Sequence, residues 1–184
     1  LFFYFRNENF TLRGIEGAFQ PTICLNLLKI KFMQSVLILH NIIRWAILIL
    51  GLLAIITSIG GMINKRTYSS ADNKISLFFM IFCDLQLLMG IILLYSNGWF
   101  AKMKSMGVVM KNSYDRFFIV EHAFMMILAW ILVHVGRTAV KKAAPESKHK
   151  KTLIFFGIAI LLILISIPWS FKGGAIARPD FPKF

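Results

Sequence analysis

The sequence predicts an all-α integral membrane protein that folds as a four-helix up-down bundle. Three observations support this prediction. First, 58% of the 184 residues are hydrophobic and only 16% are charged, with a mean hydropathy of +0.70. A single soluble domain of this size cannot bury so much apolar surface. Second, four apolar runs are each long enough to cross a bilayer. Third, the segments between these runs are polar and rich in turn-forming residues.

The first 32 residues differ from the rest of the chain. They mix phenylalanine-rich, charged and proline-containing pieces, and the first methionine is Met33. They do not show a charged region followed by an apolar region and a small-residue cleavage site, which argues against a signal peptide. We therefore expect residues 1–32 to be a non-native or disordered N-terminal extension, and residues 33–184 to form the transmembrane domain.

The transmembrane domain is expected to contain four helical spans. Each run offers about 20 residues or more, which is enough for a helix to cross a hydrocarbon core of about 30 Å. Helices are favoured because they satisfy all their backbone hydrogen bonds within one segment. The connecting loops are short, so consecutive helices are expected to run antiparallel. The predicted spans are residues 36–63, 75–95, 117–135 and 152–171.

Lysine and arginine residues predict how the bundle is oriented. They are densest in the first and third loops, and loops with excess positive charge stay in the cytoplasm. Both termini are therefore expected outside. The formal net charge of +13 is interpreted as a topology signal, with the lipid bilayer as the partner and no nucleic acid. The basic residues of the two loops are Lys65, Arg66, Lys74, Arg137, Lys141, Lys142, Lys148, Lys150 and Lys151.

Two histidines within the spans are the main candidate site, because ionisable groups in a membrane are expensive unless they are paired or face the bundle interior. His40 lies four residues after the start of the first span, and His122 lies five residues after the start of the third. These helices run in the same direction, so both imidazoles are expected about 6–8 Å below the outer boundary. This arrangement suits the two axial ligands of a b-type haem. The sequence therefore predicts His40 and His122 as the metal ligands of haem b.

The predicted helix faces agree with that arrangement. At 100° per residue, Gly51 shares the face of His40, and Ala129 shares the face of His122. These small residues are expected to thin the helices below the histidines and to leave room for a flat macrocycle. The same stripes also fit a plainer interpretation, in which the histidines are hydrogen-bonded packing residues and the small residues are close helix contacts.

Charged neighbours complete the predicted cofactor site. Arg44, one turn from His40, and Arg116, near the mouth of the bundle, are expected to pair with haem propionates. Asn41 or Glu121 is expected to accept an imidazole N–H and so select the tautomer.

Two other polar residues within the spans have competing interpretations. Asp84, near the middle of the second span, is expected to be the counter-ion of Arg44. The functional alternative is a proton-relay or quinone-contacting group. His134 lies on a different face from His122 and close to the cytoplasmic boundary. It is therefore expected to be a snorkelling polar residue rather than a second ligand.

Other kinds of metal chemistry have less support. The two cysteines do not form a Cys-x-x-Cys-His motif, so covalent haem attachment is excluded, and they are too few for a zinc or iron–sulfur cluster. Three methionines in the second loop fit the apolar stripe of an interfacial helix better than a Cu(I) site. They are Met103, Met106 and Met110.

Several motifs from Met33 onward give the chain a family resemblance. The sequence segments are LHNIIRW (39–45), ADNK (71–74), DLQLLMG (84–90), RFFIVEH (116–122), KHKKT (148–152), SIPW (166–169) and RPDF (178–181). Through them, the chain resembles small four-helix bacterial inner-membrane proteins of the cytochrome b-like family. The resemblance covers about four-fifths of the chain. It implies bound haem and a bacterial inner-membrane location, and it emphasises His40 and His122.

The expected function is that of a haem-b-binding electron-transfer subunit, or a membrane anchor, of a redox complex. One haem near one face cannot carry electrons across the bilayer, so a quinone or another redox membrane protein is the expected partner. The alternative is a cofactor-free multi-pass scaffold subunit of a membrane complex. Proton or small-solute passage has less support, because the sequence shows neither a broken helix nor an inverted repeat.

Overall fold

The computed structural model describes residues 21–174 and 176–181, and all regular structure in this part of the chain is helical. The α-helices are α1 (Pro21–Ile63), α2 (Ser70–Ser96), α3 (Trp99–Lys102), α4 (Met106–Lys111), α5 (Ser113–Asp115), α6 (Ala123–Lys141) and α7 (Lys148–Ser166). A π-helix, η2 (Arg116–His122), precedes α6. Three short 3₁₀-helices are η1 (Met103–Ser105), η3 (Pro145–Ser147) and η4 (Ser170–Lys172).

Four helical segments are long and apolar enough to cross a membrane, which confirms the all-α prediction and the four apolar helices. They are Cys24–Ile63, Ser70–Ser96, Ser113–Lys141 and Pro145–Ser166. The third segment combines α5, η2 and α6. Its start is stabilised by the side chain of Asn112, which accepts a hydrogen bond from the backbone N–H of Asp115 at 3.0 Å.

The ends of two helices differ from the predicted spans. Helix α1 begins at Pro21, so residues 21–32, which we expected to belong to the extension, continue the first helix. Proline is well suited to a first helical turn, and no helix-breaking residue separates it from the apolar run. Residues 1–20 lie outside the described residues. Helix α7 ends at Ser166 rather than near residue 171, because Pro168 disfavours a helical conformation at the residue before it.

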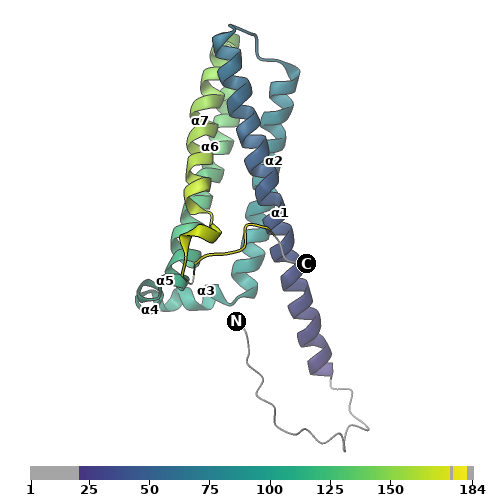
Figure 1. Ribbon diagram of the computed structural model, residues 1–184, viewed down its shortest axis with the longest axis vertical. Coiled ribbons are helices and arrows are strands. Elements are labelled where there is room, and N and C mark those ends of the chain that lie inside the picture. Colours follow the sequence, from purple (N-terminus) through teal and green to yellow (C-terminus); the bar gives the residue numbers. More distant parts are fainter. Residues whose placement is uncertain (1–20, 175, 182–184) are drawn as a thin grey trace, which may run out of the picture.

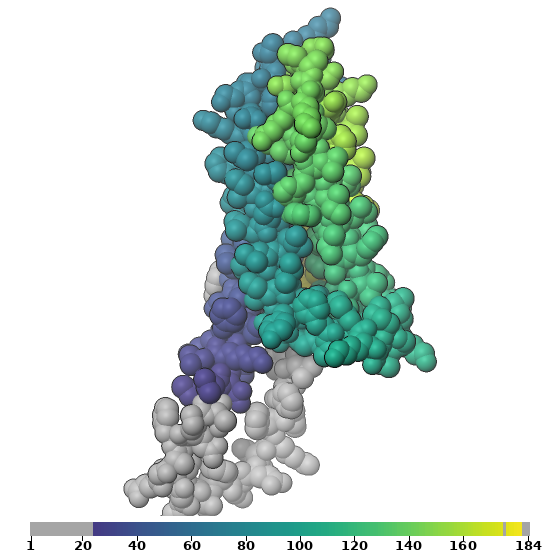
Figure 2. Space-filling view, turned by 180° about the vertical axis from the view of Figure 1, so that it is seen from behind, coloured from purple at the N-terminus to yellow at the C-terminus, as the bar shows by residue number. Residues whose placement is uncertain are grey.

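The four long helices lie side by side (Figure 1). Helix α1 packs against α2 and α7, and α6 packs against the same two helices, so α1 and α6 are diagonally opposed. The loops that follow α1 and α6 lie at one end of the molecule, and α3 to α5 lie at the other with the C-terminal residues. Figure 2 shows α3 to α5 projecting sideways from that end.

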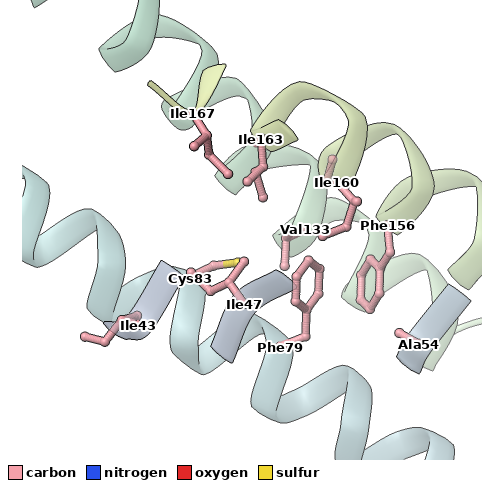
Figure 3. Packing of buried hydrophobic residues seen from close by; sticks show 12 residues of the cluster. Ile43, Ile47, Ala54, Phe79, Cys83, Val133, Phe156, Ile160, Ile163 and Ile167 are labelled. Carbon is pink, nitrogen blue, oxygen red and sulfur yellow. The ribbon is translucent and has the colours of Figure 1, made fainter. Parts of the chain in front are cut away.

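The core is formed by apolar side chains from all four long helices (Figure 3). Phe79 of α2 and Phe156 of α7 meet at its centre, with ring centroids 4.9 Å apart, and both are fully shielded from solvent. The remaining buried members are Ile43, Ile47, Ala54, Cys83, Ala129, Val133, Ala159, Ile160, Ile163 and Ile167. Through this core, α1 packs against both α2 and α7 along much of the bundle.

The small residues expected to leave room for a macrocycle are instead close-packing positions. A Cβ atom added at Gly51 would lie 2.2 Å from Cδ1 of Ile160 and 2.9 Å from Cε2 of Phe79. Ala129 is 2% exposed and belongs to the same core. The space at this level is therefore filled by side chains, and a flat cofactor would have to lie nearer to the histidines.

Candidate functional site

His40 and His122 come from diagonally opposed parts of the bundle. His40 lies on α1 and His122 is the last residue of η2, directly before α6. The two imidazoles are close enough to interact electrostatically, and both side chains are partly buried. The structure therefore brings together the two residues that the sequence predicted as a pair.

A π-helix positions His122. The seven residues of η2 coincide with the motif RFFIVEH, and Phe117 and Ile119 within it are buried. A π-helix is wider than an α-helix and is found mostly at functional sites. Its extra width shifts the faces of α6 relative to the 100° spacing assumed from the sequence. No local residue pattern signals this change, so sequence reasoning missed it.

The end of α7 orients the ring of His122. Nδ1 of His122 donates a hydrogen bond to the backbone carbonyl of Ser166 at 2.9 Å. This carbonyl is available because the chain becomes extended at Ile167, where ψ is 133°. The two preceding carbonyls are also satisfied by side chains: Leu164 by Trp169 and Ile165 by Lys172. The non-helical turn after α7 therefore supplies an acceptor to the site.

The bond to Ser166 determines which nitrogen of His122 is available. A carbonyl oxygen only accepts hydrogen bonds, so Nδ1 carries the proton and Nε2 keeps its lone pair. Metal-binding histidines usually donate the non-ligating N–H in this manner. The ring nitrogen of His122 that is left with a lone pair is therefore Nε2.

His40 lies in an interior region with unusually poor hydrogen bonding. Its ring is next to Gly90 of α2, where an added Cβ would lie 3.7 Å from Cε1. Nδ1 of His40, Oδ1 of Asn41, Nε of Arg44 and Oε1 of Gln86 are all shielded and have no partner among the described residues. Buried polar atoms are normally paired, so this group of four points to water or another bound group. Neither Asn41 nor Glu121 accepts an imidazole N–H, contrary to our expectation.

The two arginines expected near the propionates have different partners. Arg44 donates a hydrogen bond to the backbone carbonyl of Asp180, which also accepts a bond from Nε1 of Trp45 at 2.9 Å. Arg116 donates from Nε to Glu121 at 2.9 Å, and both of those side chains are half-exposed. The hydrogen bond of Arg44 is thus to a neutral carbonyl, whereas Arg116 is already paired with a carboxylate.

The C-terminal strap, residues 170–174 and 176–181, covers this end of the bundle. Phe181 stacks on Trp45 with ring centroids 5.1 Å apart. The guanidinium of Arg178 lies 5.1 Å from the ring centroids of both Tyr114 and Phe118. The strap therefore connects α1 with the α5–η2 region. In the sequence, this segment was visible only as the RPDF motif of the family resemblance.

The side chain of Asp180 holds the strap together internally. Its carboxylate accepts hydrogen bonds from Oγ of Ser170 at 2.6 Å and from the backbone N–H of Ser170 at 3.1 Å. These bonds, helped by the charge of Arg44, hold the pKa of the Asp180 carboxyl below its ordinary value. The strap is therefore favoured by an ionised Asp180.

Asp84 does not pair with Arg44, and that prediction is wrong. Oδ1 of Asp84 accepts hydrogen bonds from Nε1 of Trp130 at 2.6 Å and from Nε2 of His134 at 2.7 Å. The reason is that α2 packs against α6, and Asp84 faces that neighbour. The side chains of Asp84 and His134 are 42% and 35% exposed on the outside of the bundle. His134 is thus a hydrogen-bonding partner of Asp84 and does not simply reach toward the boundary.

Comparison with known protein families, curated proteins and solved structures gives no match for this chain. Within the described part of the chain, no three His, Cys, Asp or Glu side chains group so as to hold a metal ion. The candidate site therefore consists of two histidines, one arginine and the strap to which that arginine is bonded.

Proposed function

We propose that this protein is a cytochrome b-like electron-transfer protein that holds haem b between His40 and His122. In this proposal, the four helices form an up-down bundle in a bacterial inner membrane. The observation that supports it best is that two partly buried imidazoles from diagonally opposed helices lie within electrostatic range of each other, with Nδ1 of His122 already bonded to a carbonyl. Haem iron with two imidazole ligands exchanges single electrons.

The residues around the histidines fit this cofactor in most respects. The carbonyl of Ser166 holds the ring of His122, and Gly90 leaves space beside His40. Arg44 suits a propionate, because it is bonded to a neutral carbonyl and its Nε has no partner in the described residues. Arg116 fits less well, since Glu121 already satisfies it. The strap packs beside the site, where Phe181 stacks on Trp45.

The basic residues support an orientation with the histidines near the outer face. The loops after α1 and α6 lie at the end opposite the strap (Figure 1). From Met33 onward, these loops and the helix ends beside them carry nine lysines and arginines, against seven in the second loop and the C-terminal tail. Excess positive charge marks the cytoplasmic side. The redox partner would then meet the protein at its outer half, and a quinone or another redox membrane protein suits that position.

An absorbance spectrum of the purified protein tests the proposal. The expected result is a reduced-minus-oxidised b-type band that disappears in both His40→Ala and His122→Ala. His134→Ala is the matched control, because it removes another intramembrane histidine and should keep the band. If fully expressed, folded protein shows no Soret band after haem supplementation, the proposal is refuted.

A cofactor-free scaffold in a membrane complex is the second candidate. It is favoured by the filled core at Gly51 and by the half-exposed pair of Asp84 and His134, which faces outward at the level of the lipid. Polar residues in such positions usually contact another protein surface or a cavity. A protein that lacks a Soret band but co-purifies in a defined complex, and loses it in Asp84→Leu, would support this candidate.

A further inference from the structure

A polar pocket lies at the end of the bundle opposite the histidines. It has a volume of about 350 Å³ and is formed where the start of α2, the end of α6 and the start of α7 meet. The lining residues that matter for its chemistry are Tyr68, Ser69, Ser70, Asn73, Lys141 and Lys148. The end of the first loop and the helix ends on either side of the third loop thus form one site.

The pocket is positively charged. Lys141 and Lys148 enter it from α6 and α7, and none of its described lining residues is acidic. The carboxylate of Asp72 accepts a hydrogen bond from the lining residue Ser69, and it is already paired with Arg66 at 2.6 and 3.0 Å. Both lysines therefore lack a competing anion in the pocket wall.

A third positive charge, the guanidinium of Arg137, lies behind the residues that line the pocket. Arg137 is only 4% exposed, and its Nη1 donates hydrogen bonds to Asn73 at 2.7 Å and Ser76 at 3.2 Å. Its Nε has no partner among the described residues. Asn73 lines the pocket, so the buried guanidinium is separated from the pocket by one amide side chain.

The start of α7 adds to the positive potential of the pocket. No side chain caps this 19-residue helix, and the backbone N–H of Lys148 donates instead to the carbonyl of Pro145 in the preceding 3₁₀-helix. A helix N-terminus also carries a partial positive charge that favours anions. His149, the next residue, is 2% exposed and has no partner for either ring nitrogen, and its ring packs 5.1 Å from that of Tyr68.

We propose that this pocket binds a phosphate group through the side chains of Lys141, at the end of α6, and Lys148, at the start of α7. The hydroxyls of Ser69 and Ser70 line the same space and are suited to phosphate oxygens. An anionic lipid headgroup and a soluble phosphate share this chemistry. The location favours the lipid, because basic pockets between helices at the cytoplasmic side are typical headgroup sites. The inference does not depend on haem binding.

Native mass spectrometry of protein from mixed vesicles tests this site. The protein is reconstituted in phosphatidylcholine with phosphatidylglycerol, and the retained lipids are identified with and without added inorganic phosphate. The test variant is Lys141→Gln/Lys148→Gln. The matched control is Lys142→Gln/Lys150→Gln, which removes the same charge from exposed lysines of the same loop that do not line the pocket.

The wild type and the control variant are expected to retain phosphatidylglycerol over phosphatidylcholine. The test variant is expected to lose this preference about 30-fold, since it removes two lysines that are each worth about 1 kcal/mol toward an anionic lipid. Retention that resists inorganic phosphate identifies the lipid headgroup as the ligand, and displacement by it identifies soluble phosphate. An equal loss in both double variants, or no preference for phosphatidylglycerol in the wild type, would overturn the proposal.

Discussion

The backbone carbonyl of Ser166 accepts a hydrogen bond from Nδ1 of His122 at 2.9 Å, although the two residues are 44 positions apart. This bond links the end of α7 to the π-helix η2. It exists because α7 stops before Pro168 and leaves its last carbonyl without a helical donor. A helix stop on one element therefore determines the ring orientation of a histidine on another.

His122 and His134 are expected to carry their protons on different ring nitrogens. The acceptor of His122 faces Nδ1, whereas the carboxylate of Asp84 faces Nε2 of His134. Nitrogen NMR of selectively labelled, cofactor-free protein should therefore show a protonated Nδ1 at His122 and a protonated Nε2 at His134. Pro168→Ala, which lets α7 continue, should weaken the preference at His122 and leave His134 unchanged. The same tautomer at both histidines would contradict the assigned hydrogen bonds.

The helices were predictable because of their apolar length. Four runs of this kind have no other stable arrangement in a lipid environment, since every backbone group must be satisfied within the segment. The two basic loops were also expected on one side of the bundle, and the loops after α1 and α6 do lie at the same end of the molecule (Figure 1). The start of α1 was less predictable, as no residue between Pro21 and Met33 stops a helix.

The contacts within the candidate site were only partly predictable. Depth along the helices brought His40 and His122 together, but depth does not specify which neighbouring helix a side chain faces. For that reason Asp84 was assigned to Arg44, whereas it faces Trp130 and His134 on α6. The strap was also missed, because a short polar segment after the last apolar run has no periodic pattern that indicates where it docks.

Gly51 is expected to be intolerant of a side chain. Gly51→Ala would bring a Cβ within 2.2 Å of Ile160 and 2.9 Å of Phe79, and such overpacking usually costs about 1–3 kcal/mol of unfolding free energy. Equilibrium unfolding in mixed detergent measures this change. Gly157→Ala is the control, because an added Cβ there meets nothing within 4 Å. Ile160→Val should recover part of the loss in the Gly51→Ala background, and no recovery would place the strain elsewhere.

The docking of the strap is expected to weaken in acid. The pKa of Asp180 is held below its ordinary value of 3.8, mainly by the bonds from Ser170. A carboxyl with a lowered pKa stabilises the docked state above its ordinary pKa, and this contribution is lost as the pH falls through the lowered value. Fluorescence of Trp45, which stacks on Phe181, and of its neighbour Trp169 should therefore change below about pH 4 in a background with Trp99→Phe and Trp130→Phe.

Two variants separate this effect from general acid unfolding. Asp180→Asn should remove the acidic transition of the strap, because the amide does not titrate. Ser170→Ala should move the midpoint upward, toward the ordinary pKa, since it removes the donor at 2.6 Å. An unchanged transition in Asp180→Asn would show that another group controls docking.

Asp84 and His134 are expected to be energetically coupled. Asp84→Leu leaves the donors of Trp130 and His134 without their acceptor, which usually costs about 1–3 kcal/mol. His134→Leu in the same chain removes one of those unpaired donors, so the double variant should be less destabilised than the sum of the single variants. A coupling free energy of about 0.5–2 kcal/mol is expected from unfolding in mixed detergent.

The control cycle for this pair combines Asp84→Leu with Glu121→Gln. Glu121 is bonded to Arg116 and shares no partner with Asp84 within the described part of the chain, so these two changes should add. Additivity in the Asp84–His134 cycle would contradict the hydrogen bond. Coupling that appears only in the vesicle-bound protein, and not in detergent, would instead indicate that the half-exposed pair is strengthened by a low-dielectric surrounding, because hydrogen bonds are stronger where water is excluded.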